Sequence, residues 1–190
     1  LCMKLSENES LCNTWGIPIH VEGDEDIHSE RSANKLFKTM YDVELVLRFF
    51  AYRQKHRLHK GALEDYLDKY LEKGNYFSDE ILEKLADLFE RTINLTYEIF
   101  EEQAFYMYRE RKGKWSWYER PTVAVYDPMM LVISQNLECK DKLIAQKSDI
   151  QIAIELLYQE NYQAFGGRNV NESALLDREK LLADFIAQFV

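Results

Sequence analysis

The chain has 190 residues, of which 46% are hydrophobic and 13% aromatic, with only 7 Gly and 3 Pro. It can therefore bury a core of its own, and it lacks the turn residues that an all-β fold consumes. Its formal net charge of −9 excludes a surface that is basic throughout, although it remains compatible with a local basic face.

The three cysteines (Cys2, Cys12 and Cys139) form no CxxC motif. We therefore expect neither a disulfide framework nor a structural zinc site. No apolar run approaches the roughly 18–20 residues that a membrane span needs, and no signal peptide is visible. These features predict a cytoplasmic protein with no membrane partner. Because the chain begins with Leu1 and not with Met, we expect it to be a piece of a longer protein.

The first half of the chain is predicted to be helical. A capping box at residues 6–9 predicts a short helix that runs towards Trp15, and the acidic segment 22–26 predicts a loop. Apolar residues at i, i+4, i+7, i+11 and i+14 predict a central helix over about 29–55. A shorter amphipathic helix should end at Gly74, and a long helix capped by Ser78 should reach about residue 105.

In the second half, residues 108–120 break the helical period and predict an irregular loop or a short hairpin. Residues 123–137 are apolar on nearly all sides, as in a buried helix, and Pro128 should kink that helix or mark its start. Two more helices are predicted over about 141–165 and 173–189. We thus expect one all-α domain over residues 1–190, an irregular bundle of about six to seven helices with one irregular basic and aromatic loop.

No catalytic motif is present: GxSxG, GxxxxGK[ST], HExxH and GxGxxG are all missing. His56 and His59 have the i, i+3 spacing of two metal ligands, but no neighbouring residues complete a site. Adjacent carboxylates such as Glu101 and Glu102 are expected by chance among 33 acidic residues. We therefore predict no catalytic residue, no metal and no cofactor, and an enzyme acting through other residues stays a minor alternative.

Basic residues concentrate in two clusters, which hold 10 of the 24 in the chain: Arg48, Arg53, Lys55, Arg57 and Lys60, then Arg109, Arg111, Lys112, Lys114 and Arg120. Such segregation lets an acidic protein touch phosphates, and aromatic rings nearby could stack on bases. The predicted DNA contacts are Arg53, Arg57, Lys60, Arg109, Arg111, Lys112, Lys114, Trp115 and Trp117. The alternative is that the tryptophans pack on neighbouring helices and the charges are merely solvated.

Residues 40–51 (MYDVELVLRFFA) form the most specific run in the chain. This run resembles the start of the helical region that follows the ParB-like domain in the GmrSD-type bacterial family. Some members of that family are DNA restriction or phage-defence nucleases. Other segments resemble the family more loosely and occur in the same order along the chain, at residues 6–18, 61–70, 103–105 and 166–178.

The resemblance implies that this chain is the C-terminal helical part of such a protein, whose parent would be an NTP-dependent nuclease. The family's Asp-Gly-Gln-Gln-Arg motif and its HNH-type nuclease domain have no counterpart in the sequence, so no catalytic residue carries over. Asp42, Glu44 and Arg48 match the family pattern. We expect them to form a polar network on the helix that faces the missing N-terminal domain.

Two functional hypotheses result. In the first, the chain is a non-catalytic accessory domain of a DNA-targeting restriction or defence protein; it supports the nucleotide-handling or nuclease domain and contacts DNA. Its partners are then the missing N-terminal domain and DNA. In the second, the chain is a self-contained helical scaffold or inhibitor that binds proteins and has no nucleic-acid role.

Overall fold

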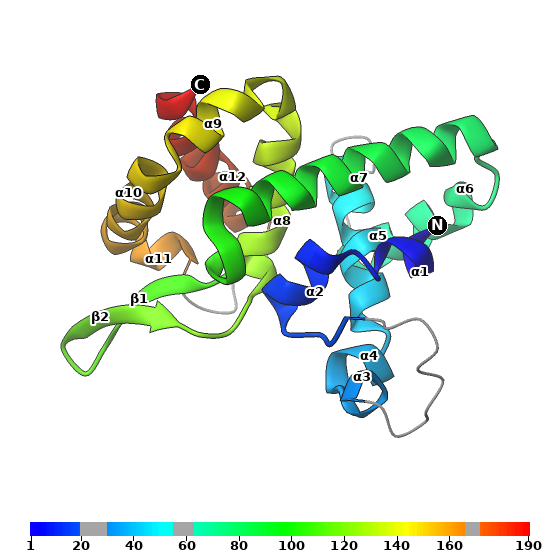
Figure 1. Ribbon diagram of the computed structural model, residues 1–190, viewed down its shortest axis with the longest axis horizontal. Coiled ribbons are helices and arrows are strands. Elements are labelled where there is room, and N and C mark those ends of the chain that lie inside the picture. Colours follow the sequence, from blue (N-terminus) through cyan, green and yellow to red (C-terminus); the bar gives the residue numbers. More distant parts are fainter. Residues whose placement is uncertain (20–29, 55–62, 166–171) are drawn as a thin grey trace. The chain divides into compact units, whose positions relative to one another are not determined.

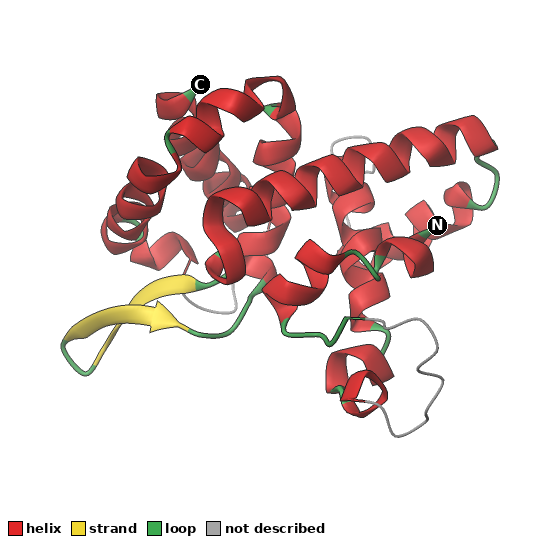
Figure 2. Ribbon diagram, viewed as in Figure 1, coloured by secondary structure: helices red, strands yellow, loops and turns green. Residues whose placement is uncertain are grey.

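The computed structural model describes residues 1–19, 30–54, 63–165 and 172–190 (Figure 1). These residues are mostly helical: they form twelve α-helices and one two-stranded sheet (Figure 2). The helical class is as predicted, but the helices are more numerous and shorter than expected. The chain packs as two compact units, Leu1–Ile93 and Asn94–Val190, and the boundary falls inside one continuous helix.

The first unit contains six helices and most of a seventh. These are α1 (Cys2–Leu5), α2 (Glu9–Trp15), α3 (Glu30–Ala33), α4 (Lys35–Lys38), α5 (Tyr41–Arg53), α6 (Leu63–Gly74) and α7 (Asp79–Phe100). Helix α2 confirms the short helix predicted before Gly16, whose φ of 63° suits a residue without a side chain. Its N-cap is Asn8, whose side chain accepts from the Leu11 amide, and not the predicted Ser6.

The helix predicted over 29–55 is divided into α3, α4 and α5. The division arises at Asn34, whose side-chain oxygen accepts from the amides of Leu36 and Phe37 and so starts a new helix. A second break lies at Met40, which has the left-handed φ of 55°. The apolar stripe of residues 29–55 continues across both breaks. Because periodicity does not register such breaks, it predicted one helix where there are three.

The core of the first unit is built on α5, which belongs to the segment predicted to form a central helix. Phe49 and Phe50 are buried, and both rings contact Phe89 of α7, with centroids 5.4 and 6.1 Å apart. Phe50 also stacks on Tyr70 of α6 at 6.3 Å. Large aromatic side chains thus join the three longest helices of this unit.

The second unit contains the end of α7 and the rest of the chain. Its helices are α8 (Val123–Gln135), α9 (Lys140–Ala145), α10 (Lys147–Glu160), α11 (Tyr162–Phe165) and α12 (Glu172–Ile186), with short 3₁₀ turns η2 (Glu101–Gln103), η3 (Leu137–Cys139) and η4 (Ala187–Phe189). Residues 125–134 of α8 are all buried, which confirms the buried helix, and α12 packs along it. Pro128 lies inside α8 and does not mark its start.

The basic and aromatic segment forms a β-hairpin, not an irregular loop. Strand β1 (Met107–Arg111) pairs antiparallel with β2 (Lys114–Tyr118), so the hairpin, one of the two structures that the sequence left open, is confirmed. The connecting residues Lys112 and Gly113 have φ of 54° and 78°. Two successive left-handed residues are typical of the type I′ turn, whose twist matches that of the flanking strands. Strand β1 packs against α10 (Figure 1).

Candidate functional site

The pairing register of the hairpin sorts its side chains onto two faces. Directly opposed residues point the same way, and successive residues along a strand point to opposite sides. The aromatic face carries Tyr108, Glu110, Trp115 and Trp117. The basic face carries Met107, Arg109, Arg111, Lys114, Ser116 and Tyr118. The tryptophans and the cations that the sequence groups together are therefore separated.

The aromatic face lies against α10 and α11. The Trp117 indole N–H donates to the Glu155 carboxylate of α10 at 3.1 Å, and its ring meets that of Tyr158 edge to face at 6.1 Å. Trp115 meets Tyr162 of α11 in the same way at 5.9 Å. The ring of Tyr108 stacks on that of Trp115 and is tilted against that of Trp117. This face fits the alternative raised from the sequence, that the tryptophans pack on neighbouring helices.

The basic face is buried only at Met107 and becomes exposed towards the tip of the hairpin. The Arg109 guanidinium lies 3.5 Å from the centre of the Tyr118 ring, a cation–π contact that holds it across the strands. Arg111, Lys112 and Lys114 are exposed at the tip, where the chain turns. Within the described ranges, none of these four cations pairs with a carboxylate. Their charge is thus available to a ligand.

The first basic cluster is arranged differently. Arg57 and Lys60, both predicted DNA contacts, lie outside the described residues. Arg53 is half-buried, its guanidinium lies 5.7 Å from the centre of the Phe49 ring, and desolvation by burial lowers its pKa. Arg48 is buried and pairs with Glu44 at 3.5 Å. The described members of this cluster therefore contribute to the packing of the first unit.

Of the three family-pattern residues, Glu44 and Arg48 pair with each other, whereas Asp42 belongs to a buried polar cluster around Arg31, a residue that the sequence did not single out. Asp42 is buried, and its carboxylate lies 3.9 Å from the Arg31 guanidinium. Arg31 also donates to the Pro18 carbonyl at 2.8 Å and lies over the Phe37 ring at 4.8 Å. This cluster connects α3, α4 and α5 within the first unit. An orientation towards another domain stays a prediction.

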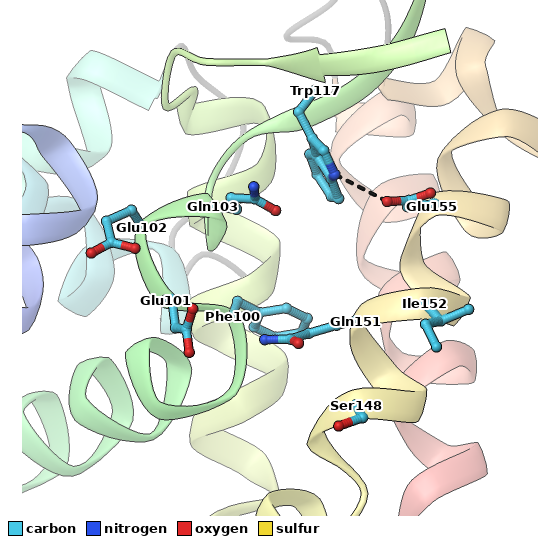
Figure 3. Close-up of a pocket in the computed structure, with 9 residues that line it drawn as sticks. All are labelled: Phe100, Glu101, Glu102, Gln103, Trp117, Ser148, Gln151, Ile152 and Glu155. Atoms are coloured by element: carbon cyan, nitrogen blue, oxygen red, sulfur yellow. Dashed lines mark hydrogen bonds between the residues drawn. The ribbon is translucent and has the colours of Figure 1, made fainter.

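A groove lies in the second unit beside the aromatic face (Figure 3). It has a volume of about 530 Å³, and the residues along it come from the end of α7, η2, β2 and α10: Phe100, Glu101, Glu102, Gln103, Trp117, Ser148, Gln151, Ile152 and Glu155. We call it the acidic groove, because three of these nine residues are carboxylates and none is a cation. Trp117 reaches from β2 towards Glu155, which lies on the α10 side (Figure 3).

Long-range contacts hold the two sides of the acidic groove together. Lys147 at the start of α10 pairs with Glu101 at 2.6 Å, and the Gln151 side-chain amide donates to the Ile99 carbonyl at 2.7 Å. Glu101 itself has a φ of 55°, a conformation that costs a residue with a side chain about 1 kcal/mol. The Tyr97 hydroxyl donates to Glu102 at 3.3 Å. The groove is therefore fixed from both sides.

A smaller inner cavity of about 20 Å³ adjoins the acidic groove and is lined by Phe100, Gln103, Trp117, Gln151, Ile154 and Tyr158. Four of these residues also line the acidic groove, so the two spaces adjoin. The Tyr158 hydroxyl is buried and has no hydrogen-bond partner in the described part of the chain. Burial also raises the pKa of Tyr158. Tyr158, whose buried hydroxyl is unsatisfied, thus lines this adjoining cavity, which we call the base of the groove.

Among the described residues, no three His, Cys, Asp or Glu side chains gather in a way that could hold a metal ion. None of the helices in the described ranges is long and apolar enough to cross a membrane. What the second unit offers is charge, ring faces and amides in fixed positions, which suits binding.

No protein-family model matches the chain, and no curated protein or solved structure is significantly similar to it. The resemblance to the GmrSD-type family therefore stays a prediction.

Proposed function

We propose that this chain is a helical accessory domain that contacts the phosphate backbone of DNA through the basic face of the β1–β2 hairpin. The resemblance of residues 40–51 implies that the domain belongs to a restriction or defence-type protein, in which another domain carries out the nucleotide-handling or nuclease reaction. The observation that carries the proposal is that Arg109, Arg111 and Lys114 share one face of the hairpin, with Lys112 at its tip.

The charge balance of the hairpin supports this proposal. Residues 107–118 contain four cations and one carboxylate, in a chain whose net charge is −9. The carboxylate, Glu110, lies on the aromatic face, so the basic face carries no negative charge. A concentrated patch of this kind binds phosphates by releasing their counterions and needs no base-specific contact.

The anchoring of the hairpin supports it as well. A two-stranded ribbon is narrow enough to enter the major groove of B-form DNA. Trp115 and Trp117 hold the ribbon against α10 and α11 through ring contacts and one hydrogen bond. A ribbon that is already ordered loses less conformational entropy when it binds, so its cations contribute more of their interaction energy to affinity.

The test is a fluorescence-anisotropy titration of the full chain against a labelled DNA duplex at about 50 and 200 mM salt. The double variant R111Q/K114Q removes two cations from the hairpin. The matched control, K142Q/K180Q, removes two exposed lysines from α9 and α12 of the same unit. Both variants shift the net charge equally, so a general electrostatic effect would change their affinities alike.

We expect R111Q/K114Q to bind about tenfold more weakly at the lower salt concentration, with unchanged thermal stability. The slope of log K against log salt should become shallower by about 1.8, because two phosphate contacts are lost. K142Q/K180Q should bind nearly as the unmodified chain does. Equal losses in both variants, or no binding by the unmodified chain at about 50 mM salt, would overturn the proposal.

A further inference from the structure

We propose that the acidic groove is a docking site for an arginine-containing segment of a partner protein. This goes beyond the contact with DNA, because it concerns the side of the hairpin that faces away from the basic face. It also rests on different residues, contributed by η2 and α10. The partner segment is identified by three features of the groove: its charge, its exposed apolar edge and the unsatisfied hydroxyl at its base.

The charge of the groove requires a cation. Glu101, Glu102 and Glu155 line it, no basic residue does, and Lys147 is already paired with Glu101 at 2.6 Å. Glu155 accepts from the Trp117 indole with one oxygen, which leaves its second oxygen for another donor. A guanidinium fits better than an ammonium, because its planar fork of N–H groups can address a carboxylate and stack on a ring at once.

The apolar edge indicates that the cation belongs to a peptide. Ile152, which lines the groove, is 73% exposed, and Leu156, one turn further along α10, is 55% exposed. Residues four apart on a helix share a face, so these side chains form one apolar strip beside the carboxylates. A metal ion or a small amine would leave this strip in water. A segment with an aliphatic residue close to its arginine would cover it.

The base of the groove supplies the second polar contact. Side chains on a helix lean towards its N-terminus, so Tyr158 leans towards Ile154 and Gln151, which line the same inner cavity. Its hydroxyl is buried and unpartnered within the described residues, and a space of about 20 Å³ holds one water-sized group. The side-chain amide of Gln151 donates one N–H to the Ile99 carbonyl, and its own carbonyl oxygen is an acceptor that this bond does not use. Both residues therefore suit the N–H groups of a guanidinium.

The test uses the full chain, labelled with ¹⁵N, and a short synthetic peptide of the sequence acetyl-LARAL-amide. Binding is followed through the indole N–H signal of Trp117, which is assigned with the W117F variant. A second peptide carries citrulline, which has nearly the shape of arginine but no charge, and a third carries glutamate. We expect the arginine peptide to bind about tenfold more tightly than the citrulline peptide, and the glutamate peptide not to bind.

Three variants separate the groove from a general acidic surface. E155Q keeps an acceptor for Trp117 but removes a charge, and should weaken binding of the arginine peptide about fivefold. K147Q removes the cation that competes for Glu101, and should strengthen binding about twofold. E160Q, which removes a carboxylate of α10 outside the groove, should change nothing. Equal effects of E155Q and E160Q would overturn the proposal.

The Y158F variant tests the base of the groove. Because the hydroxyl has no partner in the described structure, its removal should not lower the melting temperature. The same change should weaken binding of the arginine peptide about threefold, since one acceptor is lost. If binding is unchanged, or if the arginine and citrulline peptides bind equally, the groove is not an arginine site.

Discussion

The aromatic face and the basic face of the β1–β2 hairpin differ in how far the chain itself uses their side chains. On the aromatic face, Trp117 donates to Glu155 and contacts Tyr158, and Trp115 contacts Tyr162. On the basic face and at the tip, the described structure gives the four cations one side-chain contact, that of Arg109 with Tyr118. One face thus holds the hairpin in place, and the other remains open to a ligand.

This difference separates stability from binding. A substitution on the aromatic face removes packing and a hydrogen bond, so it should change the free energy of unfolding. A substitution on the basic face removes a solvated charge, so it should change affinity for an anion and little else. Position along the strand alone therefore predicts which of the two quantities will respond.

The largest effect is expected for W117A. Removing a half-buried indole should lower the free energy of unfolding by about 2–3 kcal/mol, less than the loss for a fully buried ring. R111A, on the opposite face and exposed, should stay within about 0.5 kcal/mol of the unmodified chain. Urea denaturation of both variants, followed by far-ultraviolet circular dichroism, makes the comparison.

W117F serves as the control for W117A, because it keeps a ring against Tyr158 but loses the donor to Glu155. Its loss should be intermediate, about 1 kcal/mol. If R111A destabilises the chain as much as W117A does, the basic face also takes part in holding the hairpin, and the division between the faces is wrong.

A smaller effect is expected from Tyr158, which supports the aromatic face. Burial raises the pKa of Tyr158 in the folded chain, so the folded state keeps a proton that the unfolded state loses near pH 10. Its contribution to stability is therefore complete below about pH 10 and is lost as the pH rises further. Relative to Y158F, the unmodified chain should lose about 0.8 kcal/mol between neutral pH and about pH 10.5.

Tyr70 gives the same test in the first unit. Burial raises the pKa of Tyr70 to about 12, and its hydroxyl also lacks a partner among the described residues. The difference between the unmodified chain and Y70F should therefore develop between pH 10 and about pH 12, with the same sign. Both comparisons use urea denaturation at a series of pH values. If the free energies of unfolding of the unmodified chain and of Y158F differ by the same amount at every pH, the Tyr158 hydroxyl is solvated in the folded chain.

The sequence predicts elements whose signal is local and misses those that depend on distant residues. Burial of α8 follows from a segment that is apolar on nearly all sides, and the short helix before Gly16 follows from its boundary residues. The breaks at Asn34 and Met40 were hidden by an apolar stripe that continues through them. Asn34 could have been found, because Asn before an apolar run is a common N-cap.

For the candidate site, the sequence supplies the cations but not the surface on which they lie. Two left-handed positions at Lys112 and Gly113 fix the register, and only the register separates the cations from the tryptophans. The acidic groove has no local signal at all. It depends on contacts such as that of Gln151 with Ile99, 52 residues away, and that of Trp117 with Glu155, 38 residues away.

The smallest effect is expected for K112N, which should raise the free energy of unfolding and lower the affinity for DNA. Lys112 occupies the first left-handed position of the turn at a φ of 54°, where asparagine is more favourable than lysine. The substitution should therefore stabilise the chain by about 0.5 kcal/mol while removing one cation from the tip. The slope of log K for DNA against log salt should become shallower by about 0.9. The K112R variant keeps the charge and should change neither the stability nor the salt slope by a comparable amount.

Higher stability of K112N together with weaker salt-dependent binding requires that the tip of the hairpin contribute charge to a ligand and not to the fold. If K112N binds DNA as tightly as the unmodified chain, with the same slope, then Lys112 touches no phosphate and the contact must lie further along the basic face.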